Sequence, residues 1–243
     1  MTISVDRVKS FLWQHLLLLF SLELMTVGVD LCIKSCLGSS VISSIPYILT
    51  LAGGDGMAFS LTVGGYTIAM NFFFVICQIL LLRRRFQLVQ LFQLVIGYVF
   101  GWLIDFNNVW LEPVVCDTLW SQILCQLAGC LVMGIGITFE VKCGSVTMPG
   151  EGIIIALGLV TGRPFARVKI VVDTLLVIGA VACCYIFFGR WIWSVIGPGT
   201  LFAMIFIGLV VKWLTPRIHW FDALLESPRY AVGLLAKALK HNS

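Results

Sequence analysis

Acidic and amide side chains fall inside long apolar stretches of this sequence, where charged groups are costly. Asp173 lies in the apolar run 168–188, and Asn71 lies in the run 62–82. An ionisable group inside a membrane marks the path of a solute, an ion or a proton, unless a nearby charge neutralises it. Lys169 stands one helical turn before Asp173, so a salt bridge between the two is the alternative. Both explanations of Asp173 stay open on the sequence alone.

The segment Cys143–Gly162, CGSVTMPGEGIIIALGLVTG, supplies a second acid, Glu151. Thr147 is a helix-capping residue type, Pro149 suits a first turn, and Glu151 would lie where the helix dipole favours an anion. The apolar run Ile153–Val160 is about half as long as a bilayer crossing requires. We therefore expect a short re-entrant helix with a buried polar start. The alternative is a cytoplasmic loop followed by a surface helix, in which Glu151 merely complements its own dipole.

The first apolar run contains two further acids, Glu23 and Asp30, seven residues apart and so on one helical face. We expect Asp30, near the end of the run, to be hydrated. Glu23 lies deeper and requires a partner, with Gln122 or Gln126 as candidates. A protonatable Glu23 would suit a proton-coupled cycle. Glu140, at the end of a later run, is expected to reach water by snorkelling.

The composition indicates a polytopic, all-α membrane protein. Of the 243 residues, 60% are hydrophobic and 12% are charged, and the mean hydropathy is +1.03. A soluble domain carries roughly twice that share of charge. The lipid bilayer is therefore an expected partner. The net charge of +4 is spread between the apolar runs rather than gathered in one patch, which argues against a nucleic-acid partner.

Six runs are long enough to be membrane spans, and their connections set the orientation. The predicted spans are Phe11–Leu31, Thr62–Leu82, Leu88–Asp105, Leu119–Thr138, Val168–Phe188 and Ile192–Leu214. If the spans alternate, most Lys and Arg residues fall on one side, including Arg83–Arg85. The positive-inside rule then places both termini in the cytoplasm.

The two halves of the chain resemble each other. Gly28–Lys34 corresponds to Gly136–Lys142, Ile45–Pro46 to Met148–Pro149, and Asn71–Val75 to Asp173–Val177. The outer segment Lys34–Leu61 also contains a short apolar helix, with Ser43 or Ser44 as its cap and Pro46 in its first turn. Three spans per half is an odd number, so the halves must be inverted relative to each other, a plan common among secondary transporters.

This organisation gives three parts: a first repeat at residues 1–106, a second repeat at 107–218, and a cytoplasmic tail at 219–243. In the tail, Arg229, Lys237 and Lys240 share one helical face, and leucines occupy the other. We expect an amphipathic helix on the anionic inner leaflet.

Four motifs carry a resemblance to a known family. They are Leu37–Tyr47 (LGSSVISSIPY), Leu80–Phe86 (LLLRRRF), Pro149–Gly152 (PGEG) and Val168–Asp173 (VKIVVD). In these the chain resembles the bacterial YczE/YitT-like integral membrane proteins, over almost its whole length apart from the tail. The resemblance implies a location in the bacterial inner membrane and no known enzymatic site, because that family is largely uncharacterised. Val41 departs from it, since related chains often have a proline after the Gly-Ser pair.

Two classes of function follow. The first is a small-solute secondary transporter or permease whose site lies at the repeat interface, lined by Ser43, Ser44, Asn71, Thr147, Glu151 and Asp173. Coupling would fall to Glu23, Glu151 or Asp173. The acids favour a cation or zwitterion, whereas two helix N-termini would attract a carboxylate. The alternative is a non-transporting membrane scaffold or regulator that acts through its basic cytoplasmic loops and tail.

Other chemistry is not indicated. The sequence has no Walker A, G-x-S-x-G or H-E-x-x-H motif, and its three histidines are far apart, so no enzyme, metal or cofactor is expected. None of the nine cysteines forms a metal-type pattern. Cys32, Cys36 and Cys116 fall near one membrane face, which leaves a disulfide open. A homo-oligomer is also left open.

Overall fold

Eight α-helices make up the described part of the chain, residues 5–143 and 147–221 of a computed structural model, and no strand occurs there. They are α1 (Val5–Lys34), α2 (Val41–Gly54), α3 (Val63–Leu82), α4 (Phe92–Trp110), α5 (Leu119–Cys143), α6 (Pro149–Thr161), α7 (Phe165–Phe188) and α8 (Pro198–Leu214). Two 3₁₀ segments, η1 (Arg83–Arg85) and η2 (Leu88–Leu91), connect α3 to α4. The all-helical prediction is confirmed, and the expected tail helix lies outside the described residues.

Five helices are long and apolar enough to cross a bilayer. They comprise Trp13–Lys34, Val63–Arg85, Leu88–Trp110, Leu119–Cys143 and Arg167–Phe188. These segments match the first five predicted spans to within a few residues at each end. Apolar run length is a good guide here, because each turn of helix adds a fixed rise and the hydrocarbon core has a fixed thickness.

The sixth predicted span, Ile192–Leu214, starts six residues before the helix that the structure has there. Helix α8 begins at Pro198 and has 17 residues, which is about 25 Å of helix. The preceding residues form turns, in which Trp191 Nε1 donates to the Ile196 carbonyl at 2.8 Å. Val195 and Ile196 are buried against Ile48 of α2, so this apolar stretch packs inside the protein instead of extending the helix.

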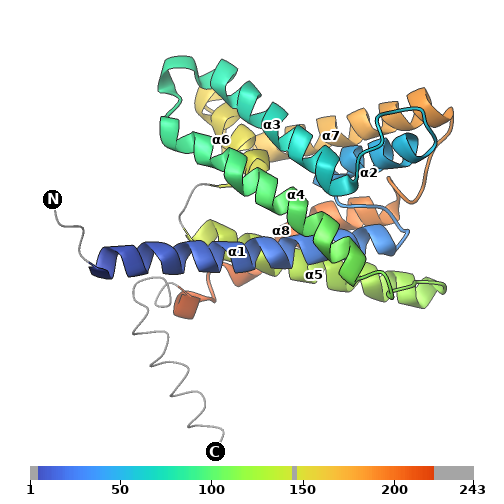
Figure 1. The fold of residues 1–243 in the computed structure, drawn as a ribbon, viewed down its shortest axis with the longest axis horizontal. Coiled ribbons are helices and arrows are strands. Elements are labelled where there is room, and N and C mark those ends of the chain that lie inside the picture. Colours follow the sequence, from blue (N-terminus) through green and yellow to red (C-terminus); the bar gives the residue numbers. More distant parts are fainter. Residues whose placement is uncertain (1–4, 144–146, 222–243) are drawn as a thin grey trace, which may run out of the picture.

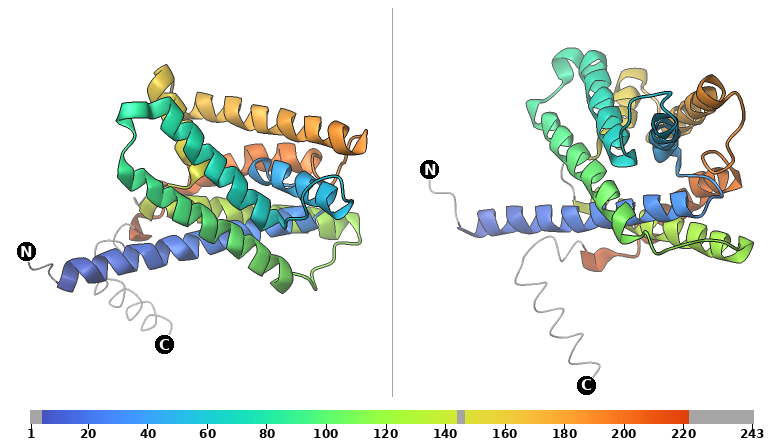
Figure 2. Two further views of the ribbon diagram at one scale, coloured as in Figure 1. Left: turned by 45° about the horizontal axis from the view of Figure 1, so that its top comes forward. Right: turned by 45° about the vertical axis from the view of Figure 1, so that its right-hand side comes forward.

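Helices α2 and α6 have 14 and 13 residues, which is about 20 Å each and too short to cross a bilayer. Figures 1 and 2 show them toward opposite ends of the bundle, with α6 near the connection between α3 and α4. Each packs on two long helices, since both α2 and α6 contact α3 and α7. Short helices at these two places were predicted, although their first turns differ from the prediction.

The caps of the short helices were predicted wrongly. Helix α2 follows Ser40, so Ser43 and Ser44 lie in its first turn and Pro46 is its sixth residue. The helix starts earlier because the chain before it is anchored, with Ser39 N donating to the Val195 carbonyl at 3.0 Å. Helix α6 is capped by Met148 rather than by Thr147, while Pro149 occupies the first turn as expected.

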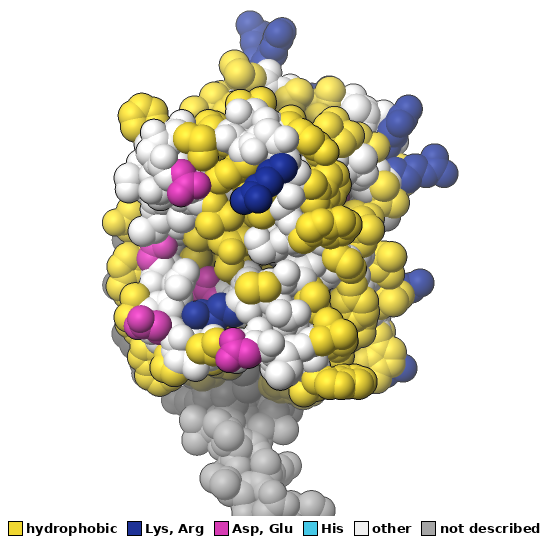
Figure 3. Space-filling model, turned by 90° about the vertical axis from the view of Figure 1, so that its right-hand side faces the viewer, with side chains coloured by type: hydrophobic (Ala, Val, Ile, Leu, Met, Phe, Trp, Pro, Cys, Tyr) yellow, Lys and Arg dark blue, Asp and Glu magenta, His cyan; other side chains and the backbone are white. Residues whose placement is uncertain are grey.

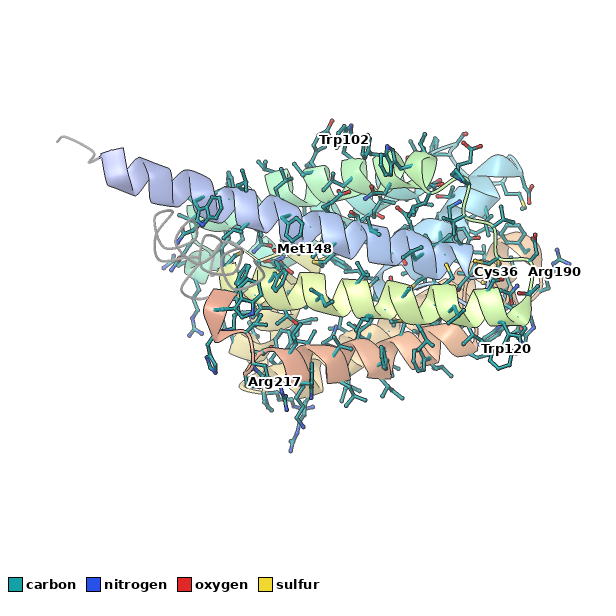
Figure 4. All side chains as sticks on the ribbon, turned by 90° about the horizontal axis from the view of Figure 1, so that it is seen from below. Cys36, Trp102, Trp120, Met148, Arg190 and Arg217 are labelled. Atoms are coloured by element: carbon teal, nitrogen blue, oxygen red, sulfur yellow. The ribbon has the colours of Figure 1, made fainter. Side chains whose placement is uncertain are left out.

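Helices α1 and α5 lie side by side and antiparallel, as Figures 1 and 4 show. Their backbones touch at Gly28, where an added Cβ would lie 2.7 Å from the Gly129 carbonyl oxygen and 2.7 Å from Met133 Cβ. Contacts this close admit no side chain. Small residues that let two backbones approach are the usual basis of helix packing in membranes.

A matching contact occurs further along the same interface. A Cβ on Gly136 would lie 2.7 Å from Met25 Cγ and 2.9 Å from the Ser21 carbonyl oxygen. Helix α4 then packs on α1, and α8 packs on α5. The α1–α5 pair thus holds α4 and α8, and α3 joins the pair through α4.

The outer surface of the bundle is apolar along its length and carries charge at its ends. Exposed side chains include Ile170, Leu175, Ile178 and Ile186 of α7, an arrangement suited to lipid contact. Figure 4 places Arg190 and Trp120 at one end and Arg217 at the other. The connections that hold Arg83–Arg85 and Arg163 lie at the Arg217 end, as Figure 1 shows.

The α1–α5 contact predicts a specific loss of stability. Gly28→Ala should lower the free energy of unfolding by about 1–3 kcal/mol, because the new methyl group overpacks against backbone. Gly208→Ala is the matched control, since a Cβ there meets nothing within 4 Å. Thermal unfolding of the purified variants in detergent measures both. Equal midpoints for the two variants would contradict the contact.

Candidate solute-binding site

The start of α6 is held inside the protein by an acid from α5. Glu140 Oε1 accepts a hydrogen bond from Met148 N at 2.8 Å, and the two residues are 3% and 1% exposed. This carboxylate takes the capping role that the sequence assigned to Thr147, which is only half-buried. The expectation that Glu140 reaches water is wrong, because its face of α5 is covered by protein.

Charged groups from two helices surround the first turn of α6. Lys169 Nζ lies 3.1 Å from Asp173 Oδ2 and 3.3 Å from Oδ1, so the salt bridge considered for Asp173 is present. The Lys169 side chain is 45% exposed, which limits the strength of this pair. Glu151 interacts electrostatically with both residues and with Glu140. The structure therefore brings together three acids and one base here, including the predicted site residues Glu151 and Asp173.

A polar stripe on α3 completes the region. Gln78 Nε2 donates to Gln93 Oε1 at 3.0 Å and to the Pro149 carbonyl at 3.2 Å, which joins α3, α4 and α6. Asn71 lies two turns earlier on the same face, and its Nδ2 donates to the Gly97 carbonyl at 3.3 Å. Sequence reasoning missed Gln78 and Gln93. The seven-residue spacing between Asn71 and Gln78 was the available signal, since it places both on one face.

Three buried oxygens in this region lack a hydrogen-bond partner within the described residues. They are Glu140 Oε2, Glu151 Oε2 and Asn71 Oδ1. All three are acceptors, and leaving a buried acceptor unpaired costs about 1–3 kcal/mol. A solute or ion that offers N–H groups, positive charge or a proton would satisfy them. The candidate site is therefore distinguished by its unpaired hydrogen-bond acceptors.

The other predicted site residues lie elsewhere or are already bonded. Ser43 Oγ bonds with Ser40 Oγ at 2.6 Å, and Ser44 Oγ donates to the Val41 carbonyl at 2.7 Å, so both are satisfied within the first turn of α2. Glu23 is half-buried on α1.

Neither glutamine proposed as a partner for Glu23 bonds to it. Gln126 pairs with Ser35 and with the Gly199 carbonyl, and Gln122 donates to the Cys116 carbonyl. The electrostatic neighbour described for Glu23 is instead Asp30, seven residues along α1.

Cysteines and metal ligands add no further chemistry to this region. All nine cysteines are free thiols, and the Sγ atoms of Cys32 and Cys130 lie 3.9 Å apart at the α1–α5 contact. Among the residues that the structure describes, no group of three or more His, Cys, Asp or Glu side chains could hold a metal ion.

The anchoring role of Glu140 can be tested with two substitutions. Glu140→Gln keeps a carbonyl oxygen for Met148 N and removes a buried carboxylate, so its unfolding midpoint should match or exceed that of the parent. Glu140→Ala leaves the Met148 N–H unpaired and should cost about 1–3 kcal/mol. Hydrogen exchange at 148–152 should then quicken in Glu140→Ala alone. Identical exchange in both variants would argue against this anchor.

Comparison with known proteins places the chain in a family without giving it an activity. No curated protein and no solved structure matches it. The profile of one family, described as a family of unknown function (DUF6198), matches residues 12–216. That match covers most of the 243 residues, from within α1 to just past the end of α8. The chain therefore belongs to DUF6198.

Proposed function

We propose that the chain is a small-solute secondary transporter or permease with six crossings, formed by two inverted repeats, α1–α4 and α5–α8. In this proposal it resides in the bacterial inner membrane with both termini in the cytoplasm, as the likeness to YczE/YitT-like proteins implies. The solute binds at the repeat interface, beside the start of α6. No catalytic step and no cofactor is part of the proposal.

One observation supports this proposal: the residues on the two sides of the α1–α5 contact occupy corresponding positions of the two predicted repeats. Gly28 meets Gly129 and Met133, and Gly136 meets Ser21 and Met25. Adding 108 to the numbers of Ser21, Met25 and Gly28 gives those of Gly129, Met133 and Gly136, so the two contacts join corresponding positions of the predicted repeats, as a twofold relation between them would require. An axis of this kind in the membrane plane relates inverted repeats.

A second pair of contacts also joins corresponding positions of the two predicted repeats. Thr26 of α1 accepts from Asn107 of α4 at 2.9 Å, and Gly134 of α5 packs on Val210 of α8. The two short helices also make corresponding contacts. Helix α2 of the first half packs on α7 of the second, and α6 of the second half packs on α3 of the first. Each short helix thus bridges the halves, where relative movement would open the site alternately to the two sides.

The polar groups at the interface suggest the type of solute. Three buried oxygens on α3, α5 and α6 lack a partner within the described residues, and the charged neighbours described for Glu151 are two acids, Glu140 and Asp173, and one base, Lys169. We therefore favour a cation or a zwitterion whose N–H groups bind these oxygens. Glu151 and Asp173 are the proposed coupling residues, while Glu23 is a weaker candidate because no described interaction joins it to them.

A ligand screen by thermal stability tests the proposal. A solute that binds the folded state raises its unfolding midpoint by mass action. We expect at least one cationic or zwitterionic metabolite to stabilise the parent and the control Asp55→Asn, whose exposed side chain lies in the connection from α2 to α3. Glu151→Gln and Asp173→Asn should weaken the effect about tenfold or more in concentration.

The same compound should then exchange across proteoliposomes that contain the parent. If these variants fold and no compound stabilises any of them, the transporter proposal fails and the scaffold alternative gains support.

A further inference from the structure

A cavity of about 380 Å³ lies at the end of the bundle opposite Arg217, away from the start of α6. The last turns of α1 line it together with the connection from α4 to α5, and α2 adds Tyr47. Its charged lining residues are Asp30, Lys34, Glu112 and Asp117. Figure 3 views this end, where acidic side chains surround a hollowed area. We refer to it as the Asp30 cavity.

Asp30 is the unusual member of the lining. It is 2% exposed, and neither carboxylate oxygen has a hydrogen-bond partner within the described residues. The expectation of a hydrated Asp30 is therefore wrong, because α4 and α5 cover this end of α1. A buried carboxylate without a partner is strongly unfavourable unless it is paired or neutral. A ligand that carries positive charge or donates a hydrogen bond would stabilise this carboxylate.

Asp105, a half-buried acid of α4, shows by contrast what a satisfied carboxylate looks like. Asp105 interacts electrostatically with Asp30, yet its own oxygens are bonded. Thr62 Oγ1 donates to Asp105 Oδ2 at 2.6 Å, and Gly64 N donates to Oδ1 at 2.9 Å. Asp105 thus holds the start of α3 and is not available to a ligand. Asp30 makes no hydrogen bond of this kind within the described residues, and its favourable charged neighbour is Lys34, one helical turn along α1.

The lining indicates an organic cation. Three acids against Lys34 leave the cavity with an excess of negative charge. A metal ion is disfavoured, since the described residues form no group of three or more ligands that could hold one. Tyr47, Ile33, Val114 and Val115 supply apolar and aromatic surface, which suits a carbon chain and a cation over a ring face. The volume also falls within the usual range for small-molecule sites.

We propose that the Asp30 cavity binds a small organic ammonium ion, whose N–H groups form charge-assisted hydrogen bonds with the Asp30 carboxylate. Glu112 lies at the exposed side of the same cavity and attracts the cation as it arrives. The inference concerns equilibrium binding and needs no transport. It therefore stands or falls separately from the proposed function.

Isothermal titration of the purified full chain with 1,4-diaminobutane tests this site. The parent should bind the diamine, and Asp30→Asn should weaken binding by about tenfold or more. Asp55→Asn removes an acid outside the lining and should stay within about twofold of the parent. The uncharged 1,4-butanediol, of similar length, should not bind. Absence of diamine binding to the parent, or equal binding of the diol, would overturn the proposal.

Two further variants keep the result decisive. Glu112→Gln should weaken binding by about two- to fivefold, and it decides the matter if Asp30→Asn fails to fold. Glu151→Gln separates this cavity from the region beside α6, because Glu151 lies outside this lining. If Glu151→Gln abolishes binding while Asp30→Asn retains it, the diamine occupies the region beside α6 and the Asp30 proposal is wrong.

Discussion

The contact between the backbones of α1 and α5 supports the rest of the structure. Lipid tails are as apolar as leucine, so burial of apolar surface gives two membrane helices little reason to associate. Close packing provides one, and Gly28 and Gly136 allow it at two places on the same interface. Helices α4 and α8 then pack on this pair, and the short helices α2 and α6 each pack on α3 and α7. A side chain at either glycine would separate the two helices on which α4 and α8 pack.

Non-helical backbone inside such a bundle must find partners within the protein, because the hydrocarbon core offers no water. The segments before α2 and α6 find them. The Leu37 carbonyl accepts from Gly199 N, while Met148 N donates to Glu140 and the Pro149 carbonyl accepts from Gln78. The buried side-chain atoms that remain unpaired in the described residues are all oxygens, on Asp30, Asn71, Glu140 and Glu151. Both candidate sites therefore call for the same chemistry, a ligand that donates hydrogen bonds or carries positive charge.

The sequence predicted the elements better than their surroundings. Run length located five long helices and two short ones among the described residues, because a helix must be long and apolar enough to match the hydrocarbon core before it can cross a bilayer. The hydration of Asp30 and Glu140 was predicted wrongly, since position along a helix does not tell which face another helix covers. Ser43 and Ser44 were assigned to a site although local bonds satisfy them. The link between Gln78 and Gln93 depends on how α3 and α4 pair, which their separate patterns do not specify.

The inversion of the two halves is the central claim, and sided proteolysis tests it most directly. One protease site would be inserted after Gly56, between α2 and α3, and another after Gly162, between α6 and α7; both positions are exposed and tolerate an added residue in the space around them. With the chain in sealed vesicles of known orientation, the account predicts that the two sites are cut from opposite faces of the membrane, the second from the cytoplasmic face. Cleavage of both sites from the same face would contradict it.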